Sequence, residues 1–253
     1  MSQRQAAHPA VGRRADDAGV PTSRALRVLY GGTFDPVHLG HLAIAEAARD
    51  VLACDVWLVP AADPPHRAAT GADAAHRARM LELAVAGKRG LRVDRRELAR
   101  AAPSYTVDTL RDVRVEIGGA MPLAFLLGAD SLRGLHTWRE WKSLLDLAHL
   151  VVAERPGQSL ETGMDPTLAV AFDGRWTDDP ADLPQAPAGF ICRLRQPLHP
   201  ASATRVRAAI AADGPWRTLV PPAVAAYIDR HRLYATAGSA SGSPLSDHGV
   251  HRP

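Results

Sequence analysis

Short apolar runs alternate with segments of helical periodicity through the middle of the chain. Runs that are apolar at successive positions are typical of strands covered on both faces, and they predict strands at 26–30, 56–59, 91–93, 123–127, 150–153 and 190–194. Apolar residues at helical spacing predict helices at 42–52, 77–86, 106–117, 141–147, 204–212 and 223–230. This alternation predicts a single-domain α/β fold, a Rossmann-like doubly wound parallel sheet with right-handed crossovers.

The two ends and one internal stretch lack such patterns. Residues 1–25 are rich in Ala, Arg, Asp and Gln, and residues 235–253 are rich in Gly, Ser and Pro. Neither end has enough apolar surface to offset the entropy lost on ordering. We therefore expect a folded domain at 26–234 between a disordered N-terminal extension (1–25) and a disordered C-terminal tail (235–253). The weakly patterned stretch 156–187 is predicted to be a long irregular insertion.

Composition narrows the class of protein. Hydrophobic residues make up 46% and charged residues 23% of the 253 residues, which excludes a wholly disordered, collagen-like or disulfide-stapled chain. The net charge of +3 fits an anionic ligand and is a weak argument for nucleic acid. Cys54 and Cys192 stand in apolar runs and are expected to be buried free thiols. Without a membrane-length apolar stretch or a secretory signal, the chain is expected to be soluble and cytoplasmic.

The first candidate site follows the first predicted strand directly. Residues 31–41 read Gly-Gly-Thr-Phe-Asp-Pro-Val-His-Leu-Gly-His and lead into a helix. In a doubly wound sheet, ligands bind beyond the carboxyl ends of the strands, and a helix start there offers N–H groups and a positive dipole end. His38 and His41 are three residues apart, so both rings can face one phosphoryl group. The sequence predicts a nucleotide phosphate site; half of a metal site is the less favoured alternative.

A second candidate site precedes a later predicted helix. Residues 202–207 read Ser-Ala-Thr-Arg-Val-Arg, so Ser202 is a plausible N-cap and leaves N–H groups at another helix start. Arg207 lies further along that helix and can hold phosphate oxygens with two parallel hydrogen bonds. The alternative is a capped surface helix whose arginines are solvated.

These motifs resemble a known family. Residues 31–41 resemble the His-x-Gly-His signature of the nucleotidyltransferase superfamily, and a longer set resembles the bacterial nicotinate-nucleotide adenylyltransferases. That set adds Pro-Pro-His-Arg at 64–67, Ala-Pro-Ser-Tyr-Thr at 102–106, Leu-Gly-Ala-Asp-Ser at 127–131, Thr-Trp at 137–138, His-Leu-Val-Val at 149–152 and the block at 202–207. The resemblance covers about residues 26–234 in order. It departs at Ala201, where isoleucine is common, and at Arg67, where many members have lysine.

The resemblance implies adenylyl transfer from ATP to nicotinate mononucleotide, giving deamido-NAD and pyrophosphate, a step of NAD biosynthesis. It implies Mg²⁺ bound with ATP, no metal site made by the protein, and neither nucleic acid nor membrane as a partner. The implied catalytic residues are His38, His41 and Arg207. The implied ATP contacts are Gly32, Thr33, Phe34, His38, His41, Asp130, Ser202, Thr204 and Arg207. The implied nicotinate-mononucleotide contacts are His66, Arg67, Tyr105, Thr106, Trp138 and Arg139.

Several alternatives stay open. Residues 64–67 can be a plain exposed turn, Asp130 can cap the next turn with Ser131, and Trp138 with Trp141 can form a core stripe, where we keep Trp141. Sibling enzymes that use phosphopantetheine or glycerol phosphate share the first motif but lack the Tyr105-Thr106 and Trp138 blocks. A non-catalytic nucleotide sensor and a nucleic-acid-binding module are the other possibilities. No Lys-Met-Ser-Lys-Ser-like loop is present, which argues against a class I aminoacyl-tRNA synthetase.

Overall fold

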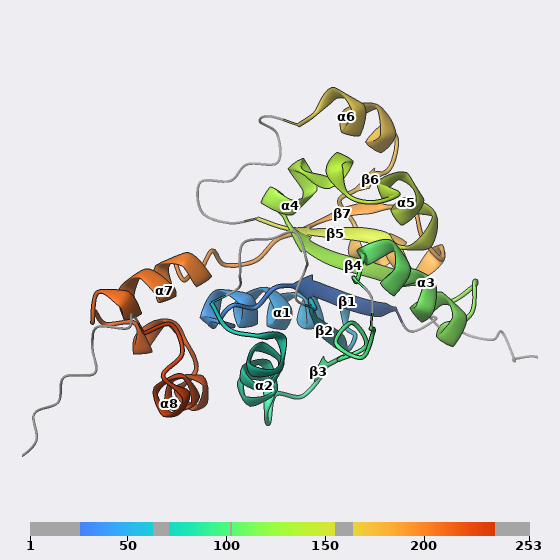
Figure 1. The fold of residues 1–253 in the computed structure, drawn as a ribbon. Helices are drawn as coiled ribbons and strands as arrows, with labels where there is room; N and C mark the ends of the chain where they lie inside the picture. Colours follow the sequence, from blue (N-terminus) through green and yellow to red (C-terminus); the bar gives the residue numbers. More distant parts are fainter. Residues whose placement is uncertain (1–25, 63–70, 102, 155–163, 236–253) are drawn as a thin grey trace, which may run out of the picture.

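Figure 1 shows a computed structural model of the chain, which describes residues 26–62, 71–101, 103–154 and 164–235. Within these ranges seven strands form one sheet in the order β3-β2-β1-β4-β5-β7-β6, and every neighbouring pair is parallel. The strands are β1 Arg27–Gly32, β2 Val56–Pro60, β3 Leu91–Val93, β4 Leu123–Gly128, β5 His149–Ala153, β6 Trp176–Thr177 and β7 Ile191–Leu194. The predicted parallel sheet is confirmed, and each of the six predicted strands is found.

Helices occupy most of the connections between the strands. In the described ranges they are α1 Leu39–Leu52, α2 Ala74–Val85, α3 Thr106–Ile117, α4 Ala129–Arg133, α5 Leu144–Leu147, α6 Pro166–Phe172, α7 Ala203–Ala211 and α8 Pro222–His231. Short 3₁₀ turns cover Leu135–Thr137, Trp141–Ser143, Pro180–Gln185 and Arg217–Leu219. The predicted helix at 141–147 is therefore a 3₁₀ turn followed by α5. The sequence missed α4, because its five residues are too few to show a helical period.

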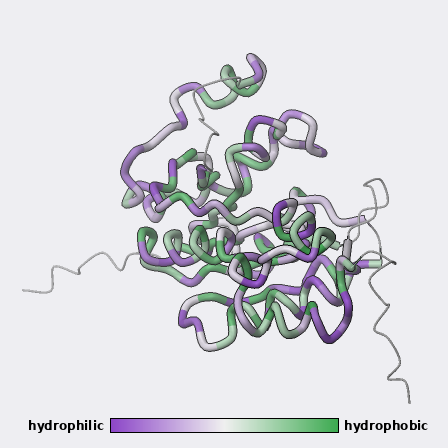
Figure 2. Tube along the Cα trace, turned by 90° about the vertical axis from the view of Figure 1, so that its left-hand side faces the viewer, coloured by the Kyte–Doolittle hydropathy of each residue, from purple (hydrophilic) through white to green (hydrophobic). Residues whose placement is uncertain are grey.

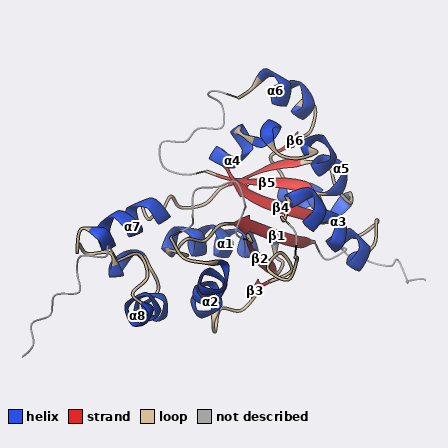
Figure 3. Cartoon of the chain, viewed as in Figure 1, coloured by secondary structure: helices blue, strands red, loops and turns tan. Residues whose placement is uncertain are grey.

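Helices cover both faces of the sheet (Figure 3), and an apolar core lies on each face, as a doubly wound fold requires. Val28 and Tyr30 of β1 face a core completed by α1, α2, α7 and α8, whereas Leu29 between them faces a core completed by α3, α4, α5 and α6. Each strand is thus covered on both sides, which explains its unbroken apolar run. In Figure 2, hydrophobic green predominates in the central elements and hydrophilic purple in the outer loops.

The strand order fixes where a ligand can bind. From β1 the chain adds β2 and β3 on one side, and from β4 it adds β5 and β7 on the other. The direction of winding therefore reverses between β1 and β4, which pair directly, with Leu29 opposite Phe125. At such a switch point the loops after the two strands diverge and leave a crevice beyond their carboxyl ends. The first motif lies in the loop after β1, at this crevice.

The prediction of an irregular insertion at 156–187 is wrong for the part that the structure describes. Residues 164–187 contain α6, the edge strand β6 and a 3₁₀ turn. Leu168 and Phe172 lie one helical turn apart and are both fully buried against the sheet. Only these two buried positions mark α6, so the apolar pattern is too short to be visible in the sequence. Residues 155–163, 1–25 and 236–253 lie outside the described residues, as does most of the predicted disorder.

The two cysteines are free thiols, as expected, although only Cys192 is buried and Cys54 is partly exposed. Burial raises the pKa of Cys54 to about 12 and that of Cys192 to about 11, so neither is a reactive thiolate at neutral pH. In the part of the chain that the structure describes, no helix combines the length and the apolar character needed to cross a membrane.

Candidate functional site

The two histidines of the first motif cap the start of α1. His38 is the N-cap residue, and its Nδ1 accepts a hydrogen bond from the His41 backbone N–H at 3.3 Å. In return, Nδ1 of His41 accepts from the His38 backbone N–H, also at 3.3 Å. This is a capping box built from two imidazoles instead of Ser or Thr with Glu. Because each Nδ1 accepts, each neutral ring carries its proton on Nε2, which is then a hydrogen-bond donor.

Aromatic side chains pack against the imidazole pair. The two rings are stacked with centroids 3.7 Å apart, and an edge-on contact places Phe34 4.9 Å from His41. Phe34 in turn packs edge-on against Tyr30 of β1. The Phe34 ring is almost completely buried in this stack, which leaves the backbone of Phe34, and not its ring, for the predicted nucleotide contact. Its side chain instead supports His41.

The second motif lies against the first. A Cβ atom on Gly40 would come within 2.9 Å of the Ala201 carbonyl oxygen, so only glycine lets the chain before α7 pass this close to α1. Ser202 is the N-cap of α7, and its Oγ accepts from the Arg205 backbone N–H at 3.2 Å, which confirms the predicted cap. The starts of α1 and α7 are therefore neighbours, although they are far apart in the sequence.

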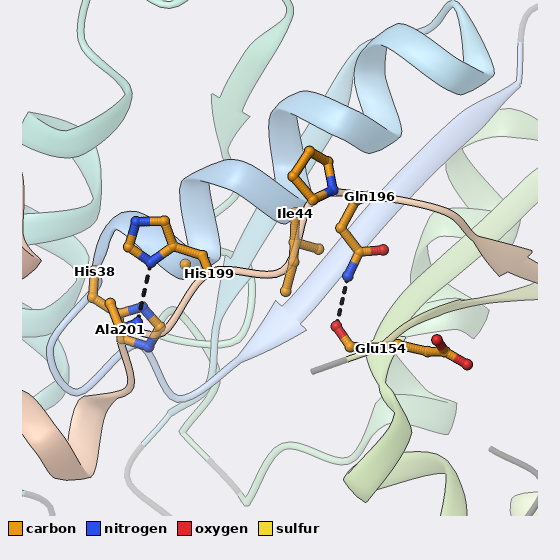
Figure 4. A pocket seen from close by; sticks show the side chains of 8 residues that line it. His38, Ile44, Glu154, Gln196, His199 and Ala201 are labelled. Carbon is orange, nitrogen blue, oxygen red and sulfur yellow. Dashed lines mark hydrogen bonds between the residues drawn. The ribbon is translucent and has the colours of Figure 1, made fainter. Parts of the chain in front are cut away.

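A small hollow opens beside His38 (Figure 4). Its lining comes from α1 and from the segments that follow β5 and β7, and consists of His38, Gly40, Ile44, Glu154, Gln196, Pro197, His199 and Ala201. Nε2 of Gln196 donates to the Glu154 carbonyl at 2.6 Å. Oε1 of the same side chain is buried and has no hydrogen-bond partner among the described residues. The hollow thus extends the histidine site toward the carboxyl ends of β5 and β7.

Arg207 reaches the first motif from α7. Its Nη1 donates to the Asp35 backbone carbonyl and lies 3.8 Å from Asp35 Oδ2. Within the described ranges, Nε and Nη2 of Arg207 make no hydrogen bond, and the side chain is 38% exposed. The guanidinium is therefore anchored on one nitrogen and keeps donors for an anion. The solvated-helix alternative is wrong for this residue.

Sequence reasoning missed a buried arginine that shapes the same loop. Arg77 of α2 is completely buried, and its Nη1 donates to the Thr33 carbonyl at 2.6 Å. Its Nε donates to the Ala72 carbonyl at 3.2 Å. Arg77 therefore ties the loop after β1 to the start of α2. The sequence did contain a signal for this role, because Arg77 occupies one of the apolar positions of α2 and a buried charge needs hydrogen-bonding partners.

A second group of predicted residues gathers at the start of α3. This helix begins at Thr106, and its N-cap Tyr105 makes no side-chain capping bond. The Arg139 guanidinium lies 4.8 Å from the centre of the Tyr105 ring. Trp138 packs edge-on against Phe125 of β4, with centroids 6.3 Å apart. The structure thus brings Tyr105, Thr106 and Arg139 together, and Trp138 packs beside them against β4, the strand next to β1.

A partly buried carboxyl group, Glu97, was also missed by sequence reasoning and lies beside this second group. Glu97 Oε1 accepts from the Thr109 hydroxyl at 2.7 Å, and the Glu97 carbonyl accepts from the Ser104 hydroxyl at 3.2 Å. Burial raises the pKa of Glu97. Through its backbone carbonyl and its carboxylate, Glu97 therefore contacts both the segment before α3 and the helix itself, on either side of Tyr105 and Thr106.

The remaining predicted residues divide between exposed, partly buried and undescribed positions. Asp130 is exposed in the first turn of α4, directly after β4, and Thr204 is exposed in the first turn of α7. Trp141 packs partly buried against the apolar core under α3, as expected. His66 and Arg67 lie outside the described residues. Among the residues that are described, no three His, Cys, Asp or Glu side chains gather to hold a metal ion.

Comparisons with known proteins agree with this site. The sequence profile of the cytidylyltransferase-like family matches residues 29–209. A Stenotrophomonas maltophilia protein named "Probable nicotinate-nucleotide adenylyltransferase" is 58% identical over 214 residues, which cover 83% of this chain and 96% of the relative. A Xylella fastidiosa (strain 9a5c) protein of the same name is 51% identical over 213 residues, with the same two coverages.

A solved structure shares the fold. The Plasmodium falciparum nicotinic acid mononucleotide adenylyltransferase complexed with NaAD superposes with a TM-score of 0.62 at 16% identity, covering 83% of this chain and 97% of that one. At this identity the match supports the fold alone. The family profile and the close relatives carry the assignment. The chain belongs to the cytidylyltransferase-like family and, within it, to the nicotinate-nucleotide adenylyltransferases.

Proposed function

We propose that this chain transfers the adenylyl group of ATP to nicotinate mononucleotide, giving deamido-NAD and pyrophosphate. The observation that carries the proposal is the meeting of two helix starts, α1 with its imidazole pair and α7 with Arg207, at the switch point between β1 and β4. Two helix N-termini with three cationic or N–H-donating side chains suit the triphosphate of a nucleotide. The sequence identity to the curated relatives specifies the acceptor.

The reaction needs charge stabilisation more than proton transfer. An oxygen of the acceptor phosphate, already an anion at neutral pH, attacks the α-phosphorus of ATP in line, and the bond to the bridging oxygen of pyrophosphate breaks. No general base and no covalent enzyme intermediate are required. The Nε2–H donors of His38 and His41 and the guanidinium of Arg207 then neutralise negative charge on the phosphoryl oxygens and on the leaving group.

The remaining ATP contacts come from the loops around these groups. Gly32 ends β1 and is followed in the loop by Thr33 and Phe34, whereas Ser202 caps α7 and Thr204 lies in its first turn. Asp130, exposed after β4, suits a ribose hydroxyl. Magnesium bound with ATP would be held mainly by phosphate oxygens and water, and it would supply further charge neutralisation. This mode of binding suits a site whose described residues form no carboxylate cage.

The acceptor binds beside Tyr105 and Trp138. In this proposal their rings border the pyridine and the backbone N–H groups of Thr106 and Arg139 bind its carboxylate. Family resemblance assigns contact with the phosphates to His66 and Arg67, which lie outside the described residues. Thr106 is the first residue of α3, where N–H groups have no partner within the helix. The free thiols of the chain suit the reducing cytoplasm, where we propose that the reaction takes place.

Competition between the two pyridine mononucleotides tests this function. A carboxylate only accepts hydrogen bonds, whereas a carboxamide also presents an NH₂ group that would face N–H donors unpaired. We expect kcat/KM to favour nicotinate over nicotinamide mononucleotide by at least about tenfold to a hundredfold. Pyrophosphate release with Mg²⁺-ATP and each mononucleotide measures it. Equal efficiency, or a preference for the amide, would assign the chain to another member of the superfamily.

Removing the Trp138 ring separates stacking from recognition of the carboxylate. Trp138→Ala is expected to raise KM for both mononucleotides by about two- to tenfold, because ring stacking is worth roughly 0.5–1.5 kcal/mol and does not distinguish acid from amide. The acid-to-amide ratio should stay the same. Trp176→Ala, at the partly exposed β6 edge far along the sheet from β1, is the matched control and should leave both KM values unchanged. A changed ratio with unchanged KM would contradict the stacking role.

A further inference from the structure

The carboxylate of Asp35 is the centre of a buried network that the reaction as described above does not use. Asp35 stands in the loop after β1 and is only 7% exposed. Its Oδ2 accepts from the Gly71 backbone N–H at 2.8 Å, and its Oδ1 accepts from the Ala72 N–H at 3.1 Å. The phenol of Tyr234 donates a third hydrogen bond to Oδ1 at 2.8 Å. Three donors from two distant parts of the chain therefore fix one carboxylate.

Arg207 is anchored on this same residue. Its Nη1 donates to the Asp35 carbonyl and stands 3.8 Å from the Asp35 carboxylate. The position of the guanidinium thus depends on the orientation of Asp35. Any group that fixes Asp35 also fixes the donors that Arg207 keeps for an anion.

The Tyr234 ring packs closely against the backbone beside Asp35 and Arg207. A Cβ atom on Gly71 would lie 2.6 Å from the Tyr234 ring and 3.2 Å from Arg207 Cδ, so the glycine lets both side chains pack against the same backbone. Burial and the neighbouring Asp35 carboxylate raise the pKa of the Tyr234 phenol, which therefore stays protonated and donates. Tyr234 lies just beyond α8, close to the end of the described chain.

We propose that Tyr234 is a positioning residue of the phosphate site: its hydroxyl holds Asp35, and Asp35 holds Arg207 in the orientation that binds ATP. This inference rests on the proposed role of Arg207 in adenylyl transfer. It assigns a task in that transfer to the C-terminal end of the folded chain, more than 25 residues beyond the last motif of the site.

The test removes one hydroxyl. Tyr234→Phe keeps the ring that packs on Gly71 and loses only the hydrogen bond to Asp35. We expect kcat/KM for ATP to fall about tenfold, the size expected for losing one hydrogen bond to a charged group, with KM for nicotinate mononucleotide unchanged. Tyr227→Phe is the matched control, because its hydroxyl bonds to His76 Nδ1 at 2.9 Å where α8 meets α2, and not to Asp35. It should lose similar thermal stability and keep the kinetics of the parent protein.

Combining variants shows whether Tyr234 acts through Arg207. In an Arg207→Ala background, Tyr234→Phe should cause no further loss of ATP efficiency, since the guanidinium that it positions is gone. A full additional loss there, an equal loss in Tyr227→Phe, or no loss in Tyr234→Phe alone would each overturn the inference. Normal kinetics of Arg207→Ala alone would instead refute the proposed role of Arg207, a result that is distinguishable from these three.

Discussion

Replacing His41 with alanine is expected to lower turnover by about 10²-fold or more, the range for losing one preorganised donor that stabilises developing charge. The Nε2–H of His41 is such a donor, because its Nδ1 already accepts the His38 backbone N–H. Initial rates of pyrophosphate release at saturating ATP and nicotinate mononucleotide measure the effect. His231→Ala, which removes an exposed imidazole on α8, is the control and should retain normal turnover.

The same substitution is also expected to destabilise the protein. From sequence alone, His41 faces a crevice and folding should be little changed. The structure corrects this expectation, since the His41 ring is buried and satisfies a backbone N–H of the helix start. Loss of such a cap costs about 0.5–2 kcal/mol.

His41→Gln separates the two effects, because a glutamine at this position can still accept from the N-cap N–H. We expect His41→Gln to recover most of the thermal stability and to remain slow. A folded His41→Ala or His41→Gln protein with near-normal turnover would contradict the assignment of the histidine.

Arg207→Ala is expected to lower kcat/KM for ATP by about a hundredfold, since charge-assisted bonds to phosphate contribute about 1.5–3 kcal/mol each. Arg207→Lys should recover only part of the loss. A lysine can replace the bond from Nη1 to the Asp35 carbonyl or contact a phosphate, but one ammonium does not reproduce the planar fork. Steady-state kinetics with varied ATP measure both variants.

The matched control for the Arg207 substitutions is Arg205, which lies on the same helix, α7. Arg205 is exposed, and its side chain contacts only the Pro200 carbonyl at 3.5 Å among the described residues. Arg205→Ala removes the same charge from α7 and should leave the kinetics unchanged. Equal effects of the two substitutions would mean that α7 contributes general positive charge rather than a directed contact.

The local sequence pattern determined the strands, the helices and the parallel sheet of this protein. Buried strands on both faces need unbroken apolar runs, and helices between them need apolar residues at helical spacing, so the parallel sheet could be predicted from periodicity alone. The position of the first motif followed, because it stands directly after β1 and before α1. The Ser202 cap could also be predicted, since it depends on a hydroxyl and an N–H only three residues apart. The element α6 was missed because two buried positions do not form a visible period.

Only the tertiary structure decided how the site is held together. The Tyr234–Asp35 hydrogen bond joins residues 199 positions apart, and the Arg207–Asp35 bond joins residues 172 positions apart. Neither contact could be predicted from the spacing of residues in the sequence, because hydrogen-bonding partners brought together by folding need no particular separation along the chain. The sequence predicted His38, His41 and Arg207 as catalytic residues from their residue types and from family resemblance. It could not show that Asp35, Arg77 and Tyr234 form a hydrogen-bonded network around the first motif, since a buried polar residue is recognised by its partners, and folding alone supplies them.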